Sequence, residues 1–463
     1  MKPSAVAAYA AMLLTGVAIV LLVSRYGETL IAPPAAAPVA SASTTAPAAS
    51  NVVLHVLLAL TAVLVTGRCL GALLRTVGQP PVIGEVLAGI LLGPSLLGRL
   101  APAVSVYILP PEVAPFLNVV AQLGVILYMF LVGLELNGEL LRGRAHTTVA
   151  ISHASILAPF VLGCLLALQL YTRFSTSNVS FTSFALFMGV AMSITAFPVL
   201  ARILSDRGMT RTPLGAVALT CAAADDVTAW CLLALVVGVA QARMQDALIV
   251  IALTLAFIAM MWMAIRPIVE RLVARTGSGA PTQNHIALAL AGLLLAALAT
   301  ERIGVHAVFG AFLFGAVIPH DSRLAGALKG KLEDLVTILL LPAFFAFTGM
   351  RTEIGLMSQP SEWLFCGVII VVATAGKFGG TIAAARFAGM DWRHSAGLGI
   401  LMNTRGLMQL IVLSLGLDLG VISPKLFTMM VIMALVTTIA TTPVLQLLGS
   451  FAEPIQRPKR AAV

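Results

Sequence analysis

Two adjacent aspartates, Asp225 and Asp226, lie near the centre of the apolar segment 213–241. A charged side chain in hydrocarbon costs about 2.5–3.5 kcal/mol even on a lenient insertion scale, so this pair indicates a function. Neighbours on a helix point about 100° apart, so one aspartate can face Lys377 while the other faces a water-filled cavity. A carboxylate that holds alternately a proton and a bare metal cation is the minimum chemistry of cation/proton exchange. We therefore assign the carrier role first to Asp226 and second to Asp225, with a transported monovalent cation as the bound metal.

Two other apolar segments, 181–204 and 395–417, contain helix-breaking residues near their centres. A proline inside a helix removes one backbone hydrogen bond and frees a carbonyl. Interrupted helices at the midplane of corresponding halves are the best sequence indication of a transporter binding site, since their free carbonyl oxygens can bind a cation. We expect Arg405 to offset the carbonyl ends of the broken helices. The supporting residues are Ser193 and Pro198 in the first segment and Asn403, Thr404 and Arg405 in the second.

The composition requires a membrane environment for these residues. The chain has 463 residues, of which 59% are hydrophobic and 10% charged, whereas soluble domains carry roughly a quarter charged residues. The net charge of +9 does not indicate nucleic-acid binding, because the basic residues are scattered between apolar segments. The five cysteines show no disulfide or zinc spacing, so we interpret them as small buried hydrophobic residues and expect no cofactor.

About 13 segments of spanning length follow Asn51. Most Lys and Arg residues lie in the loops after odd-numbered segments, so the positive-inside rule places those loops in the cytoplasm. We expect a multi-pass inner-membrane protein whose core starts outside and whose C-terminus is cytoplasmic. The expected spans are 51–73, 81–100, 114–136, 147–171, 181–204, 213–241, 246–265, 284–301, 304–319, 333–350, 361–386, 395–417 and 424–449.

The sequence also contains an internal repeat. Val82, Gly84 and Gly89 of the second span recur as Val308, Gly310 and Gly315 of the ninth at one constant offset. The two spans run in opposite directions, as in the inverted repeats of secondary transporters. The predicted fold class is therefore an all-α polytopic membrane protein, with about 13 transmembrane helices in two inverted six-helix repeats and two broken crossing helices.

We predict three regions. Residues 1–50 hold an N-terminal hydrophobic segment, either a signal sequence or an extra span, and an Ala/Pro-rich linker. Residues 51–452 form the transmembrane domain, and residues 453–463 form a short basic cytoplasmic tail.

Five motifs together resemble the second branch of the monovalent cation:proton antiporter superfamily. The resemblance covers about residues 51–449 and implies a homodimer with a mobile core. It also implies that Asp226 binds the ion, that Asp225 pairs with Lys377, that Thr195 contacts the cation and that exchange is electrogenic. The motifs are GQPPVIGEVLAG (78–89), SITAFPVLAR (193–202), DDVTAW (225–230), HAVFGAFLFG (306–315) and NTRG (403–406).

Two positions depart from the pattern of this superfamily. No nucleotide-binding regulatory domain is expected after the last span, because only a few residues follow it. Many relatives carry a glutamate where this chain has Gln409, so we assign no second carboxylate role there.

The expected function is secondary exchange of Na⁺ or K⁺ for H⁺ by alternating access in the lipid bilayer. An alternative is a gated cation channel or potassium efflux pathway without strict proton coupling. An intramembrane aspartyl protease needs aspartates that converge from different helices, so we do not expect an enzyme. A transport-dead sensor does not account for the complete set of Asp225, Asp226 and Lys377.

Overall fold

The structure is a computed structural model that describes residues 3–34, 52–135, 145–210, 212–241, 244–275 and 281–449. Within these ranges the regular elements are all helical, which confirms the expected fold class. Each of the 13 expected spans coincides with a helix or with a pair of consecutive helices. Most of the predicted linker after Ala32 and the predicted tail 453–463 lie outside the described residues.

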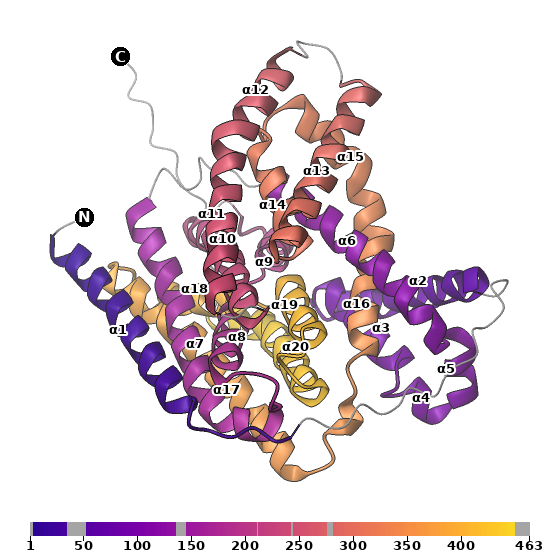
Figure 1. Ribbon diagram of the computed structural model, residues 1–463, viewed down its shortest axis with the longest axis horizontal. Coiled ribbons are helices and arrows are strands. Elements are labelled where there is room, and N and C mark those ends of the chain that lie inside the picture. The colour runs from indigo at the N-terminus through magenta and orange to yellow at the C-terminus, as the bar shows by residue number, and fades with distance from the viewer. Residues whose placement is uncertain are drawn as a thin grey trace.

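The helices follow one another with short connections (Figure 1). A π-helical stretch joins α11 to α12 and another joins α15 to α16, so each pair forms one long rod. The α-helices are α1 Pro3–Gly27, α2 Val52–Thr76, α3 Pro81–Leu92, α4 Leu97–Leu100, α5 Pro102–Ile108, α6 Ala114–Glu135, α7 Ala145–Phe174, α8 Phe181–Ser193, α9 Phe197–Asp206, α10 Pro213–Gln241, α11 Met244–Met260, α12 Arg266–Arg275, α13 Gln283–Ile303, α14 Ala307–Val317, α15 Arg323–Leu335, α16 Leu341–Met350, α17 Pro360–Phe387, α18 Trp392–Met402, α19 Leu407–Asp418 and α20 Pro424–Leu447.

Eleven helices of the described residues are long and apolar enough to cross a membrane, including the N-terminal helix at Tyr9–Gly27. Three further apolar helices are shorter. Two of them are cut short by the interruptions of their spans. The number of crossings predicted from the sequence therefore stays a prediction.

The helices form two packed groups. We call α2, α3, α6, α13, α14 and α16 the scaffold group, and α7 to α10 with α17 to α20 the core group. Figure 1 shows α2 and α3 on the side of the molecule opposite to α7 and α17.

Glycines on matching positions let the scaffold helices approach closely. A Cβ on Gly84 or Gly310 would lie 2.4 Å or 2.2 Å from the backbone of the preceding long helix, α2 or α13. A Cβ on Gly89 would lie 2.2 Å from a carbonyl of α16, and one on Gly315 would lie 2.3 Å from a carbonyl of α6. Small residues permit such backbone approach between membrane helices. Helix α3 of the first half thus packs against α16 of the second half, and α14 of the second half packs against α6 of the first. Such reciprocal packing is what an inverted repeat requires.

Both predicted interruptions occur. Helix α8 ends at Ser193 and α9 begins at Phe197, while α18 ends at Met402 and α19 begins at Leu407. The two unwound stretches cross in direct contact, because the backbone N–H of Ala196 donates to the carbonyl of Thr404 at 3.0 Å. Each unwound stretch thus provides a hydrogen-bond partner for the backbone of the other.

The N-terminal helix α1 lies along α7 and α8 of the core group (Figure 1). A Cβ on Gly16 would come within 2.6 Å of the Leu157 side chain of α7, and Thr182 donates a hydrogen bond to Glu28 at 3.2 Å. Helix α1 therefore contacts the core group rather than the scaffold group.

The expectation that all five cysteines are buried is wrong for two of them. Cys164, Cys221 and Cys366 are buried, whereas Cys69 and Cys231 are exposed. The exposed pair lies on faces of α2 and α10 that no other described helix covers, and the apolar character of these segments does not reveal which face is covered.

Candidate ion-binding site

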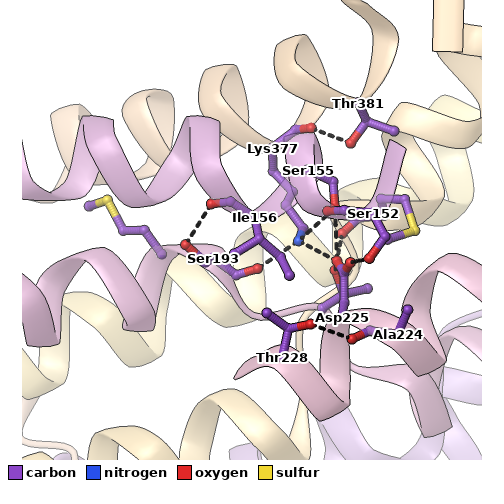
Figure 2. Close-up of polar contacts among 12 residues, drawn as sticks. Ser152, Ser155, Ile156, Ser193, Ala224, Asp225, Thr228, Lys377 and Thr381 are labelled. Atoms are coloured by element: carbon purple, nitrogen blue, oxygen red, sulfur yellow. Dashed lines mark hydrogen bonds and ion pairs between the residues drawn. The ribbon is translucent and has the colours of Figure 1, made fainter. Parts of the chain in front are cut away.

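Helix α10 carries Asp225 into a cluster of donors from three other segments of the core group (Figure 2). Ser152 of α7 donates to Oδ1 at 2.6 Å, and Ser155 of the same helix donates to Oδ2 at 2.8 Å. Thr195, in the break between α8 and α9, donates to Oδ2 at 3.0 Å, as does Lys377 Nζ of α17 at 2.8 Å. A buried carboxylate with four donors is held as an anion in a fixed orientation.

Lys377 joins this carboxylate to the end of a broken helix. Its side chain is fully buried, and the ammonium also donates to the backbone carbonyl of Ser193 at 2.6 Å. Ser193 is the last residue of α8, where carbonyl groups lack helical partners and carry partial negative charge. The Asp225–Lys377 ion pair is therefore attached to the break in α8.

Arg405 occupies the other side of the same helix end. Its guanidinium is fully buried and donates to the carbonyls of Ala191 at 3.2 Å and Met192 at 2.7 Å. It also donates to the Gln409 side chain at 3.2 Å. Two buried cations thus neutralise consecutive carbonyls at the end of α8.

Asp226 differs from its neighbour in having no partner. The side chain is 2% exposed, and neither carboxyl oxygen has a hydrogen bond among the described residues. The backbone N–H of Phe197, at the start of α9, and the phenol of Tyr128 on α6 lie within electrostatic range of it. A buried carboxylate without partners requires a proton or a cation to compensate it.

A cavity of about 560 Å³ leads toward Asp226 between the core and scaffold groups. Phe197, Val199 and Ala201 of α9 line its core side. Its scaffold side carries Glu85 of α3 and Glu135 of α6. Asp226 does not itself line the cavity, but Phe197, which does, has its backbone N–H directed at this carboxyl group.

The crossing supplies the remaining predicted residues. The single hydroxyl hydrogen of Thr195 is shared between Asp225 Oδ2 and the carbonyl of Met402, each 3.0 Å from its oxygen, which ties the first break to the second. The Oδ1 atom of Asn403 is buried without a hydrogen-bond partner in the described structure, and the Thr404 hydroxyl donates to that of Thr441 at 3.4 Å. Pro198 is the second residue of α9, a position that needs no backbone N–H donor.

Sequence reasoning missed Ser152 and Ser155. Serines in membrane helices commonly bond to their own helix backbone, so their presence in segment 147–171 was no signal by itself. Their spacing of three residues, which places both hydroxyls on one face of α7, was the available indication. No group of three or more His, Cys, Asp or Glu side chains that could hold a metal ion occurs in the described residues.

Residues 56–448 match the sodium/hydrogen exchanger transmembrane family. The chain belongs to this family. It is 43% identical over 397 residues to the Na(+)/H(+) antiporter NhaS4 of Synechocystis, an alignment that covers 85% of this chain and 97% of NhaS4. The family expected from the five motifs is therefore confirmed.

Other members of the exchanger family are longer. Cation/H(+) antiporter 17 of Arabidopsis thaliana is 39% identical over 82% of this chain, and K(+)/H(+) antiporter 1 of Saccharomyces cerevisiae is 32% identical over 80% of it. This chain spans 47% and 43% of these two proteins. The fold is similar to that of the sodium proton antiporter MjNhaP1 from Methanocaldococcus jannaschii, with a TM-score of 0.63 at 15% identity, covering 86% of this chain and all of that one.

Proposed function

We propose that this chain is a secondary antiporter that exchanges Na⁺ or K⁺ for H⁺ at Asp226. The observation that carries this proposal is a buried carboxyl group with two unpartnered oxygens, beside Phe197, which lines a cavity between two helix groups. Such a group takes a proton or a bare cation in turn, and this competition couples the two fluxes. The names of the relatives, which are Na(+)/H(+), K(+)/H(+) and cation/H(+) antiporters, support exchange over the channel alternative.

The crossing of the broken helices completes the cation site in this proposal. Monovalent alkali cations bind to carboxylate, carbonyl, amide and hydroxyl oxygens. Asp226 supplies the charge, and Asn403 Oδ1 is a further buried acceptor without a partner. Thr195 holds the two breaks together and contacts the cation through its oxygen.

Asp225 and Lys377 are proposed to respond to occupancy at Asp226. With both aspartates ionised, the two carboxylates balance Lys377 and Arg405, which are also fully buried. A cation at Asp226 adds one positive charge to this balanced set, which weakens the hold on the Lys377 proton. Release of that proton on cation binding moves more than one proton per cation, and exchange is then electrogenic.

We propose that residues 51–452 form the transport domain of a homodimer in a cell inner membrane, with its C-terminus in the cytoplasm. The N-terminal ends of α3 and α16 line the cavity. Arg75 in the last turn of α2 and Lys329 in α15 precede these ends. By the positive-inside rule the cavity then opens to the cytoplasm.

Reconstituted vesicles with a preset pH gradient test this function. We expect Na⁺ or K⁺, added separately, to dissipate the gradient, and we expect Asp226→Asn to abolish the response while the protein stays folded. A diffusion potential imposed with an ionophore should change the rate if exchange is electrogenic. Cation flux without any pH change would favour the channel alternative and contradict the proposal.

A further inference from the structure

The interface between the core group and the scaffold group differs at its two ends. At one end the cavity of about 560 Å³ separates α9 of the core group from α3, α6 and α16 of the scaffold group. At the opposite end, where α16 and α19 both finish, the groups are in direct polar contact. Helix α16 begins at Leu341, which lines the cavity, and ends at Met350, so one helix spans the distance between the two ends.

The closed end contains an ion pair across the two groups. Arg351, at the C-terminus of α16, donates to Asp418, the last residue of α19, with Nη2 and Oδ1 2.6 Å apart. The side chains are 25% and 38% exposed, so water reaches the pair. The guanidinium also lies over the Phe347 ring at 5.6 Å, which limits its rotamers.

Two neutral contacts support the pair. The backbone N–H of Glu353 donates to the hydroxyl of Thr428 on α20 at 3.2 Å, and the hydroxyls of Thr348 and Ser414 lie 3.5 Å apart. All three contacts join α16, or the chain directly after it, to α19 or α20 of the core group. Movement of the core group that closed the cavity and opened this end would separate them.

We propose that Arg351 and Asp418 form an outer latch, which stabilises the state open toward the cavity and must break once in each transport cycle. The inference rests on the proposed exchange function and adds to it a residue pair that sets the balance between the two states. A latch of one partly exposed ion pair is suited to this role, because such pairs are weak enough to break during turnover.

The free energy of the Arg351–Asp418 ion pair sets how far its removal shifts the ratio of the two states. Removal of a partly exposed ion pair changes the ratio of the two states by about 1.5- to fivefold toward the state open at the latch end. The fraction of molecules with an accessible cavity end then falls by at most this factor, and by less where that state predominates. A purely structural pair, in contrast, would alter folding yield and leave the ratio unchanged.

Cysteine labelling measures this ratio without transport. Ala201→Cys places a thiol on the cavity wall, in a background where the exposed Cys69 and Cys231 are replaced by serine. A membrane-impermeant maleimide is applied to vesicles of both orientations. We expect Arg351→Gln and Asp418→Asn each to slow labelling from the cavity side, by at most about fivefold.

Two further variants make the test specific. The exchange of charges, Arg351→Asp with Asp418→Arg, should restore the labelling rate to near that of the parent. Lys425→Gln breaks an ion pair with Glu362 inside the core group, so it should leave the rate unchanged. Equal labelling in all variants, or equal slowing by Lys425→Gln, would overturn the latch. Absence of cation-dependent proton flux in the parent would instead refute the proposed function, and the labelling comparison would still decide the latch.

Discussion

The buried ion pair between Lys377 and Asp225 offers the most demanding test of the site. Lys377→Met leaves a carboxylate that keeps the hydroxyl donors of Ser152, Ser155 and Thr195 and loses its counter-charge. Removal of one partner from a fully buried pair costs about 3–5 kcal/mol, because the remaining charge stays without compensation. Asp225→Asn orphans the buried ammonium and should cost a similar amount.

The double variant should cost much less than either single one. Replacement of both members of a buried pair by neutral groups of similar size is often close to neutral. With an unfolding entropy of about 2.1 cal/mol/K per residue over roughly 400 residues, 3–5 kcal/mol lowers the melting temperature by about 4–6 °C. The double variant should melt within about 2 °C of the parent.

Thermal unfolding in detergent, followed by intrinsic fluorescence at one scan rate, measures these shifts. The exposed pair of Lys329 and Glu135, 2.5 Å apart and 44% exposed on both sides, provides the matched control. Lys329→Met should lower the melting temperature by about 1 °C or less, since exposed pairs contribute at most about 1 kcal/mol. If the shifts of the two single core variants simply add in the double variant, the reasoning on compensated charge is refuted.

Two more outcomes follow from contacts outside the ion pair. Thr195→Val removes the hydroxyl that bonds both Asp225 and the Met402 carbonyl. It should therefore lower the exchange rate and reduce the stability by about 1–3 kcal/mol in a melting assay. Thr195→Ser should retain the exchange rate and the stability of the parent. Gly89→Leu places a side chain where a Cβ already meets the backbone at 2.2 Å, so size-exclusion chromatography should show a misassembled protein, whereas Gly326→Ala, with nothing within 4 Å, should elute like the parent.

The broken helices were predictable from the sequence because their residues act locally. Pro198 cannot continue a helix that starts before it, and the stretch from Asn403 to Gly406 joins residues of weak helix propensity. The structure ends α8 at Ser193, five residues before the proline, since its ring excludes helical backbone in the preceding turn. The direct contact of the two breaks needs the three-dimensional fold.

Other features depended on packing that the sequence does not encode locally. The hydroxyls of Ser152 and Ser155 become significant only because α7 and α10 bring them to Asp225. A glutamate near a span end, such as Glu85, is typical of an interfacial side chain, yet the scaffold group places it in the cavity wall. Which face of a helix meets another helix was not evident from uniformly apolar segments such as α10.

The short helices α8, α14 and α19 have a consequence for the biogenesis of this protein. With 13, 11 and 12 residues, each reaches only about 20 Å at 1.5 Å per residue, against about 30 Å of hydrocarbon. Neither α8 nor α19 can leave the insertion machinery alone, because the unwound backbone next to it would meet lipid without partners. Segments 181–206 and 392–418 must therefore enter the bilayer together with neighbours such as α7 and α20. Truncation between the two segments should leave the first one retained at the translocon or degraded.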